Sequence, residues 1–176
     1  TGEFAEWIGA AAGIDAPPSW WELCLYDVQG ATVLGADRSL LASGRLDNQL
    51  SCWAAVTALV ESDPTDSIAV IVLNDHEEVG SASATGAAGP FLQTVLSRLV
   101  SARGGSHDEF HRSFAASACI SADNAHAVHP NYPERHEPGH RPIVNAGPAI
   151  KVNSNQRYAT SAETATVFQQ ACERAG

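Results

Sequence analysis

Apolar residues recur with a helical period in four stretches of the chain. A spacing of three and four residues places apolar side chains on one side of a helix, so these stretches predict amphipathic helices. They run from Glu3 to Ala12, from about Gln49 to Glu61, from about Pro90 to Arg103, and from near Ala162 onward. Gly13 is positioned to end the first helix and Ser161 to cap the last.

Four other stretches have the pattern of strands. Residues 20–27 alternate well enough to bury one face, whereas 67–73 and 113–120 are short apolar runs typical of buried strands, and 148–153 forms a short one. Polar residues gather where these strands end. Open α/β sheets place their chemistry beyond the ends of their strands, so the polar residues are the candidates for a functional site.

The stretch 74–81 follows the strand at 67–73 and contains the neighbouring acids Glu77 and Glu78. Adjacent side chains in extended backbone point to opposite sides, so one carboxylate could hold a metal ion while the other handles a proton. Taken alone, the same stretch is better explained as a solvated acidic loop.

Two further strand ends supply acids. Asp47 precedes the helix at 49–61, where it or Asn48 could simply cap that helix, although a carboxylate at such a junction can also reach a metal. Asp123 follows the strand at 113–120. If the strands are neighbours, these acids converge on one edge of the sheet, and divalent cations would compensate their charge.

Composition narrows the function classes. The chain has 176 residues, 44% of them hydrophobic, which indicates one domain together with a fragment of another. The net charge of -10 argues against a nucleic-acid partner, and no apolar run is long enough for a membrane span. Four scattered cysteines without a C-x-x-C pair indicate reduced core thiols in a cytosolic protein. Because methionine is absent, we expect the chain to be a piece of a longer protein.

Four segments resemble the aspartyl aminopeptidases in order and spacing: residues 44–48, 75–81, 121–132 and 151–160. These enzymes are cytosolic dizinc exopeptidases that remove acidic residues from the N-termini of peptides. The resemblance covers nearly all of the chain. It implies a metal-dependent aminopeptidase that removes N-terminal Asp or Glu by means of a water activated by two divalent ions, with zinc as the expected metal.

The resemblance also implies roles for individual acids. Asp47 resembles the carboxylate that bridges the two metal ions, and Glu78 and Asp123 resemble terminal ligands of one metal each. Glu77 resembles the general base that deprotonates the bridging water, in contact with the substrate.

Three further residues resemble the substrate pocket of this family. His126 resembles the residue that contacts the substrate or the tetrahedral oxyanion. Lys151 resembles the cation that pairs with the acidic side chain of the substrate, and Tyr158 is a neighbouring candidate. From the residues alone, Lys151 is also explained as a charge on an edge strand that discourages aggregation.

The fold implied by the resemblance is α/β, a mixed sheet flanked by helices of the zinc-exopeptidase type, incomplete at both ends in this chain. Residues 1–38 resemble the tail of an inserted dimerisation domain, and residues 39–176 resemble the central part of the catalytic domain. The family assembles as dimers within a tetrahedral dodecamer, so a homo-oligomer is implied, with peptides as partners and no nucleic acid or membrane.

The chain departs from the family in its histidines. The family draws one histidine ligand from upstream of the inserted domain and another from near the C-terminus, but here no histidine precedes His76 or follows His140. A second hypothesis is therefore a non-catalytic fragment or assembly module that lacks a complete metal site. A third keeps the dimetal hydrolase but changes its target to an N-acyl or other amide substrate.

Overall fold

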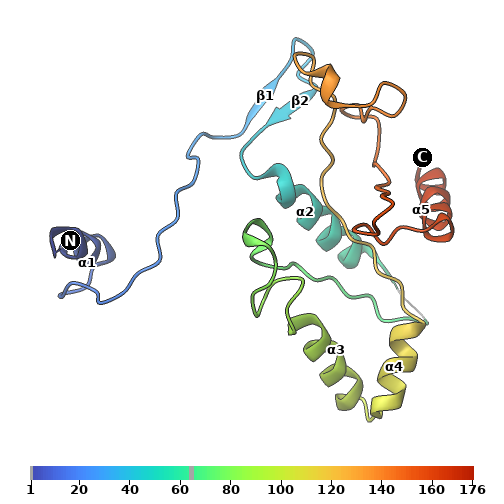
Figure 1. The fold of residues 1–176 in the computed structure, drawn as a ribbon, viewed down its shortest axis with the longest axis horizontal. Coiled ribbons are helices and arrows are strands. Elements are labelled where there is room, and N and C mark those ends of the chain that lie inside the picture. Colours follow the sequence, from blue (N-terminus) through green and yellow to red (C-terminus); the bar gives the residue numbers. More distant parts are fainter. Residues whose placement is uncertain (1, 64–65) are drawn as a thin grey trace. The chain divides into compact units, whose positions relative to one another are not determined.

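A computed structural model describes residues 2–63 and 66–176 of the chain. The chain divides into two compact units, one extending to Leu46 and the other covering Asp47–Gly176. Figure 1 traces the elements of each unit in sequence order. No helix among the described residues is both long enough and apolar enough to span a membrane.

The first unit begins with helix α1 (Gly2–Ala12), as its apolar period predicts. Gly13, in the left-handed region at φ 70°, follows the helix, and the chain then folds back over it. A Cβ atom at Gly9 would stand 2.9 Å from the carbonyl oxygen of Ala16, so the lack of a side chain at Gly9 permits this close approach. Ile8 is the large apolar side chain that becomes buried here.

A short antiparallel hairpin completes the first unit. Strands β1 (Thr32–Leu34) and β2 (Leu40–Ala42) pair with Val33 opposite Leu41. The turn begins at Gly35, with φ 89°, and the Asp37 carboxylate accepts hydrogen bonds from the hydroxyl and the backbone N–H of Ser39. Those bonds hold the pKa of Asp37 below its ordinary value. A strand end before Asp47 was expected from the sequence, and β2 is in that position. Strand β1 is too short for its alternation to be recognised.

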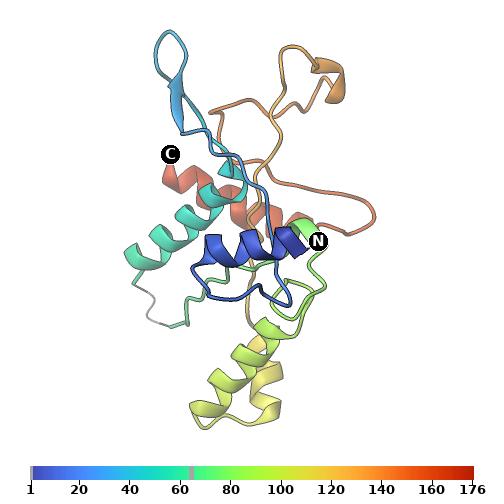
Figure 2. The same cartoon turned by 90° about the vertical axis from the view of Figure 1, so that its left-hand side faces the viewer.

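The second unit contains a helical hairpin. Helix α3 (Phe91–Ala102) has Pro90 at its N-cap and packs beside α4 (His107–Ala115), as both views of the ribbon show (Figure 1, Figure 2). Gly104 adopts φ 81° in the connecting turn. Phe110 of α4 is 6% exposed and is the large buried apolar side chain of this unit among the described residues.

Two longer helices of the chain also match their sequence patterns. Helix α2 (Leu46–Glu61) has non-helical dihedral angles at Asp47 and Asn48, so the regular helix follows those residues, close to the predicted start at Gln49. Helix α5 (Ala162–Ala175) is capped by Ser161, whose hydroxyl accepts the backbone N–H of Thr164. The predicted helices are therefore all present.

The four strand predictions, for residues 20–27, 67–73, 113–120 and 148–153, are wrong. Residues 20–27, 67–73 and 148–153 form no strand in the structure, and α4 extends through Ala115 into the stretch 113–120 that was predicted as a strand. A β-strand is defined by hydrogen bonds to a partner strand, and these apolar segments have no ladder partner among the described residues. The apolar pattern of a segment predicts extended backbone, but it does not show whether another segment pairs with it.

The cysteines are free, as expected, but they are not all in a core. Cys24 and Cys119 are exposed, and Cys52 and Cys172 are partly buried. The interpretation of all four as core thiols is therefore wrong, although no disulfide links them.

Candidate functional site

The acidic segment forms a short 3-10 turn at Glu77–Val79, and both of its carboxylates are exposed. The turn lies between two residues in the left-handed region, His76 at φ 60° and Gly80 at φ 96°. Such a conformation is uncommon for a histidine and usually needs support from its surroundings. Asp75 provides part of it, since its carboxylate accepts the backbone N–H of His76 at 2.8 Å.

The small-residue loop that follows provides the rest. The His76 Nδ1 atom shares a 2.6 Å hydrogen bond with the Ser83 hydroxyl, which also accepts the backbone N–H of Gly86 at 3.1 Å. A Cβ atom at Gly86 would stand 2.3 Å from the Ser81 carbonyl oxygen, and one at Gly89 would stand 2.1 Å from that of Ser83. The glycines therefore let the loop close tightly behind Glu77 and Glu78 and fix the segment that carries them.

Asp47 lies at the start of α2 with an exposed side chain and extended dihedral angles. The peptide bond between Asp47 and Asn48 is cis. The Asn48 side-chain oxygen accepts a hydrogen bond from the thiol of Cys52, one turn along the helix. Asn48 thus interacts with the first turn of α2, and the Asp47 carboxylate faces solvent.

Asp123 forms an ion pair with Lys151, across 28 positions in the sequence. The Lys151 ammonium also donates to the backbone carbonyl of Asn124 at 3.0 Å and lies 5.8 Å from the centre of the Tyr158 ring. The Ser51 hydroxyl of α2 donates to the Asn124 side chain at 2.9 Å. These contacts join α2 to the segments around Asp123 and Lys151.

The pairing of Asp123 with Lys151 has a simple electrostatic reason. The resemblance expects a metal cation at Asp123 and a substrate carboxylate at Lys151, and in this structure the two side chains neutralise each other instead. The Lys151 side chain is 26% exposed, so its charge is partly removed from water and benefits from a nearby anion. The lysine environment is therefore one that accepts a carboxylate.

His126 has an exposed side chain, and its backbone carbonyl accepts a hydrogen bond from His136 Nε2 at 2.9 Å. Val128 donates its N–H to the Pro142 carbonyl at 2.8 Å. The loop between them is a turn-rich excursion with a 3-10 turn at Pro133–Arg135. The two contacts hold the ends of this excursion together beside His126.

The expected convergence of the acids is not found. Within residues 2–63 and 66–176, no group of three or more His, Cys, Asp or Glu side chains lies close enough to hold a metal ion, so Asp47, Glu78 and Asp123 do not form a cluster. The physical reason is that the acids were expected at the ends of neighbouring strands, and those strands do not pair. Carboxylates are suitable zinc ligands, but the described residues do not bring these three together around one ion.

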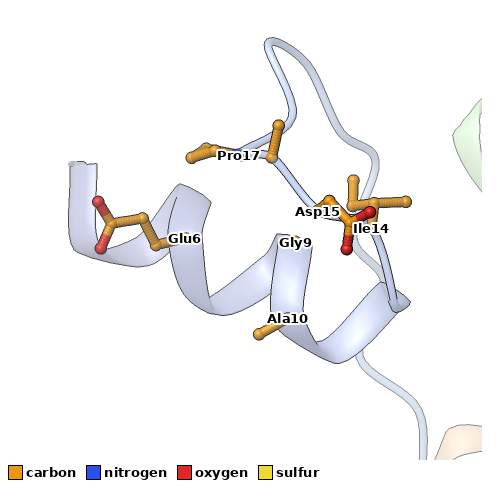
Figure 3. Close-up of a pocket in the computed structure, with 7 residues that line it drawn as sticks. Glu6, Gly9, Ala10, Ile14, Asp15 and Pro17 are labelled. Carbon is orange, nitrogen blue, oxygen red and sulfur yellow. The ribbon is translucent and has the colours of Figure 1, made fainter.

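Two hollows among the described residues lie elsewhere. One has a volume of 240 Å³. In Figure 3 the carboxylate of Glu6 projects from α1, and Ile14, Asp15 and Pro17 lie in the chain after it. A second, of 310 Å³, is lined by Ser19, Trp20 and Trp21. Neither is lined by a residue of the four motifs.

Sequence reasoning missed Asn124 as a structural partner of this site. Its backbone carbonyl and its side chain bind Lys151 and Ser51, respectively. Its position directly after Asp123 was the available signal, but an asparagine in a loop has many possible roles and the long-range contacts follow only from the fold.

Comparisons with known proteins give a consistent result. Residues 16–176 match the Peptidase_M18 family, described as aminopeptidase I zinc metalloprotease. A probable M18 family aminopeptidase 2 from Mycobacterium leprae is 52% identical over 155 residues, which is 88% of this chain and 36% of that protein. The protein of the same name from Stutzerimonas stutzeri is 55% identical over 152 residues, which is 86% of this chain and 34% of that protein.

Solved structures agree. The crystal structure of yeast aminopeptidase 1 has a TM-score of 0.81 and 28% identity, covering 98% of this chain and 41% of that one. The S. cerevisiae mApe1 dodecamer has a TM-score of 0.73 and 25% identity, covering 98% and 41%. This likeness confirms the predicted fold class, of which the chain spans a part. The chain is about a third of the length of the curated relatives it matches.

Proposed function

The chain belongs to the M18 family of aminopeptidase I zinc metalloproteases, and from that premise we propose that the whole protein is a metal-dependent aminopeptidase that removes N-terminal Asp or Glu from peptides. The observation that carries the proposal is the match over residues 16–176, which includes all four acidic and basic motifs. Two divalent ions, with zinc as the expected metal, are part of the proposal. Bound ions of this kind supply a polarised water at neutral pH.

The assignment of Asp47, Glu78 and Asp123 as metal ligands and of Glu77 as the general base is part of the same proposal. Its support is the motif resemblance together with the fixed position of the Glu77–Val79 turn, which the His76–Ser83 contact and the two close glycines secure. A proton-transfer group must keep its position relative to the reacting atoms, and a rigid turn serves that need.

The preference for acidic substrates rests on Lys151. Its ammonium already binds the Asp123 carboxylate, so the same charge can receive the carboxylate of a substrate side chain, and the nearby Tyr158 is a neighbouring part of the proposed pocket. His126, exposed in the loop beside Asp123, is proposed as a further substrate contact.

Kinetics on peptides with N-terminal Asp, Glu or Ala test the role of Lys151. Lys151→Gln should raise KM for the acidic substrates by roughly tenfold or more while leaving the Ala substrate unaffected, because one charge-assisted contact contributes about 1.5–3 kcal/mol. Lys151→Arg, which keeps the charge, is the matched control. An equal rise in KM for all three substrates in the Lys151→Gln variant would refute the proposed role of Lys151.

We further propose a cytoplasmic homo-oligomer in which residues 1–38 are the tail of a dimerisation domain and residues 39–176 part of the catalytic domain. The dodecameric state of the structurally similar mApe1 supports the oligomer, and four cysteines without a disulfide support a reducing compartment. Light scattering of the intact protein measures the oligomer directly, and a monomer at micromolar concentration would end this part of the proposal.

The decisive experiment is the Glu77→Gln variant of the intact protein. Removing a general base should lower kcat by about 10²–10⁴-fold with little change in KM. Glu61→Gln, at an exposed position at the end of α2 and outside the motifs, is the matched control and should keep full activity. Turnover that survives either Glu77→Gln or a strong chelator would refute the metal-dependent mechanism.

A second function is favoured by one observation, the absence of a three-ligand group among the described residues. On this proposal the 176-residue chain is a non-catalytic assembly module, and catalysis needs parts of a longer protein. Elemental analysis of the chain separates the two proposals. Two bound ions per chain would defeat the module, and no bound metal would support it.

A further inference from the structure

Helix α4 carries two histidines on one exposed face. His107 and His111 are four residues apart, a spacing that places them one above the other on the helix. Their Nε2 atoms are 3.1 Å apart, the ring centres are 4.5 Å apart, and the ring planes are nearly perpendicular at 89°. Both rings therefore bring Nε2 to the same exposed place on the helix, where the two nitrogens lie within hydrogen-bond distance of each other.

The helix holds this geometry by local means. The Ser106 hydroxyl accepts the N–H of Glu109 at 3.2 Å while the Glu109 carboxylate accepts the N–H of Ser106 at 2.6 Å, a complete capping box around His107. Phe110 is buried and contacts the His111 ring edge-on at 5.2 Å between ring centres. The capped first turn and the buried neighbour thus stabilise the helix that carries both histidines.

The separation of the two nitrogens matches a chelating pair. With metal–nitrogen bonds of about 2.0–2.1 Å, two nitrogens on one ion stand about 2.9 Å apart at a right angle and about 3.3 Å apart at a tetrahedral angle. The observed 3.1 Å lies between these values. The same separation lets one ring donate its Nε2–H to the other ring, and metal binding at both Nε2 atoms requires that ring to carry its proton on Nδ1 instead.

We propose that His107 and His111 form a two-histidine binding site for a divalent transition-metal ion, with water completing its coordination. Imidazole is a preferred ligand of copper, nickel and zinc, and copper(II) binds such nitrogen pairs most tightly of the three. The site shares no residue with the acidic motifs. Within the described residues no third His, Cys, Asp or Glu joins the pair, so the ion stays open to solvent or to a ligand from another molecule.

Binding at this site also stabilises the helix. Two ligands one turn apart come together only when α4 is formed, so the ion binds the folded helix in preference to the unfolded one. We therefore expect copper(II) to slow amide hydrogen exchange at residues 107–115 in the unsubstituted protein.

Copper titration of the intact, zinc-saturated protein tests the proposal, with electron paramagnetic resonance as the readout. We expect one further copper(II) per chain whose spectrum shows coupling to two imidazole nitrogens. His107→Asn and His111→Asn should each abolish this equivalent. His140→Asn is the matched control, because His140 is exposed and bonded only locally to Glu137 in the contacts described, and it should leave the titration unchanged.

The proposal fails if both variants bind the further copper with the same two-nitrogen spectrum, or if the unsubstituted protein binds none. Hydrogen exchange makes the result independent of the variants. Unchanged exchange at residues 107–115 on copper addition to the unsubstituted protein would also overturn it. Neither outcome depends on aminopeptidase activity, so failure here is distinguishable from failure of the proposed function.

Discussion

The α3–α4 hairpin and the acidic segments of the second unit both carry side chains that can bind metal ions, but only in the hairpin do such side chains lie close together. In the hairpin, His107 and His111 come within 3.1 Å of each other because one helical turn separates them. In the acidic segments, Asp47, Glu78 and Asp123 are separated by tens of residues and form no cluster among the described residues. Local spacing assembles a pair by itself, whereas distant residues need a complete sheet to bring them together.

The two regions are also stabilised differently. The hairpin depends on one buried aromatic side chain, Phe110, and on a capped helix end. The loop behind Glu77 depends on glycines that admit backbone within 2.3 Å of an added Cβ atom and on the His76–Ser83 hydrogen bond. If the two regions are stabilised independently, a substitution in one should destabilise that region and leave the other unchanged. Amide hydrogen exchange measures the protection of each region separately.

Phe110→Ala should have the largest effect. Removing a buried phenylalanine costs about 3–5 kcal/mol, so the exchange of α3 and α4 amides should accelerate strongly while residues 74–89 keep their protection. Phe91→Ala, in the same hairpin but with a side chain that is 48% exposed, is the matched control and should change little. Equal acceleration in both regions would show that they unfold as one unit and would break the contrast.

Gly86→Ala is the converse change, with an intermediate effect. Its methyl group would meet the carbonyl of Ser81, a backbone atom that cannot rotate away, so the loop must shift at a cost of roughly 1–3 kcal/mol. We expect faster exchange at residues 74–89, weaker aminopeptidase activity, and an unchanged hairpin. Gly30→Ala is the control, because an added Cβ there meets nothing within 4 Å. Full activity in Gly86→Ala would show that the tight loop does not position Glu77.

These differences explain what the sequence could predict. Helices α1, α2, α3 and α5 were predictable because their apolar period and their caps, such as Ser161, lie within the segment itself. Helix α4 could have been found from Ser106 and Glu109, a capping box, but the apolar run after it dominated the interpretation. The strands at 20–27, 67–73 and 148–153 could not be settled, because a strand depends on a partner elsewhere in the chain.

In the candidate site, too, contacts between residues near in sequence were predictable and contacts between distant segments were not. The closeness of Lys151 to Tyr158 was predicted from their separation by only seven positions and is present in the structure, with the ammonium 5.8 Å from the ring centre. The ion pair of Lys151 with Asp123 was not predicted, since it joins segments 28 positions apart and arises only from their approach in the fold. The ligand assignments for Asp47, Glu78 and Asp123 stay predictions.

The smallest expected effect is a pH dependence confined to the hairpin. The Ser106 N–H donates to the Glu109 carboxylate, which lowers the pKa of Glu109 from its ordinary value of 4.5. A carboxyl whose folded pKa is lowered contributes stability that is fully present above the unfolded value and is lost as the pH falls through the folded value. Protection of α4 amides, corrected for intrinsic exchange, should therefore decline below about pH 4.5. Helix α5 is the internal control, because its capping box is closed by the Thr164 hydroxyl, which does not titrate. Glu109→Gln keeps a capping side chain without the charge and should remove the difference between the two helices. A decline of α4 protection that persists in Glu109→Gln would assign the pH dependence to another group and leave the capping box without a part in it.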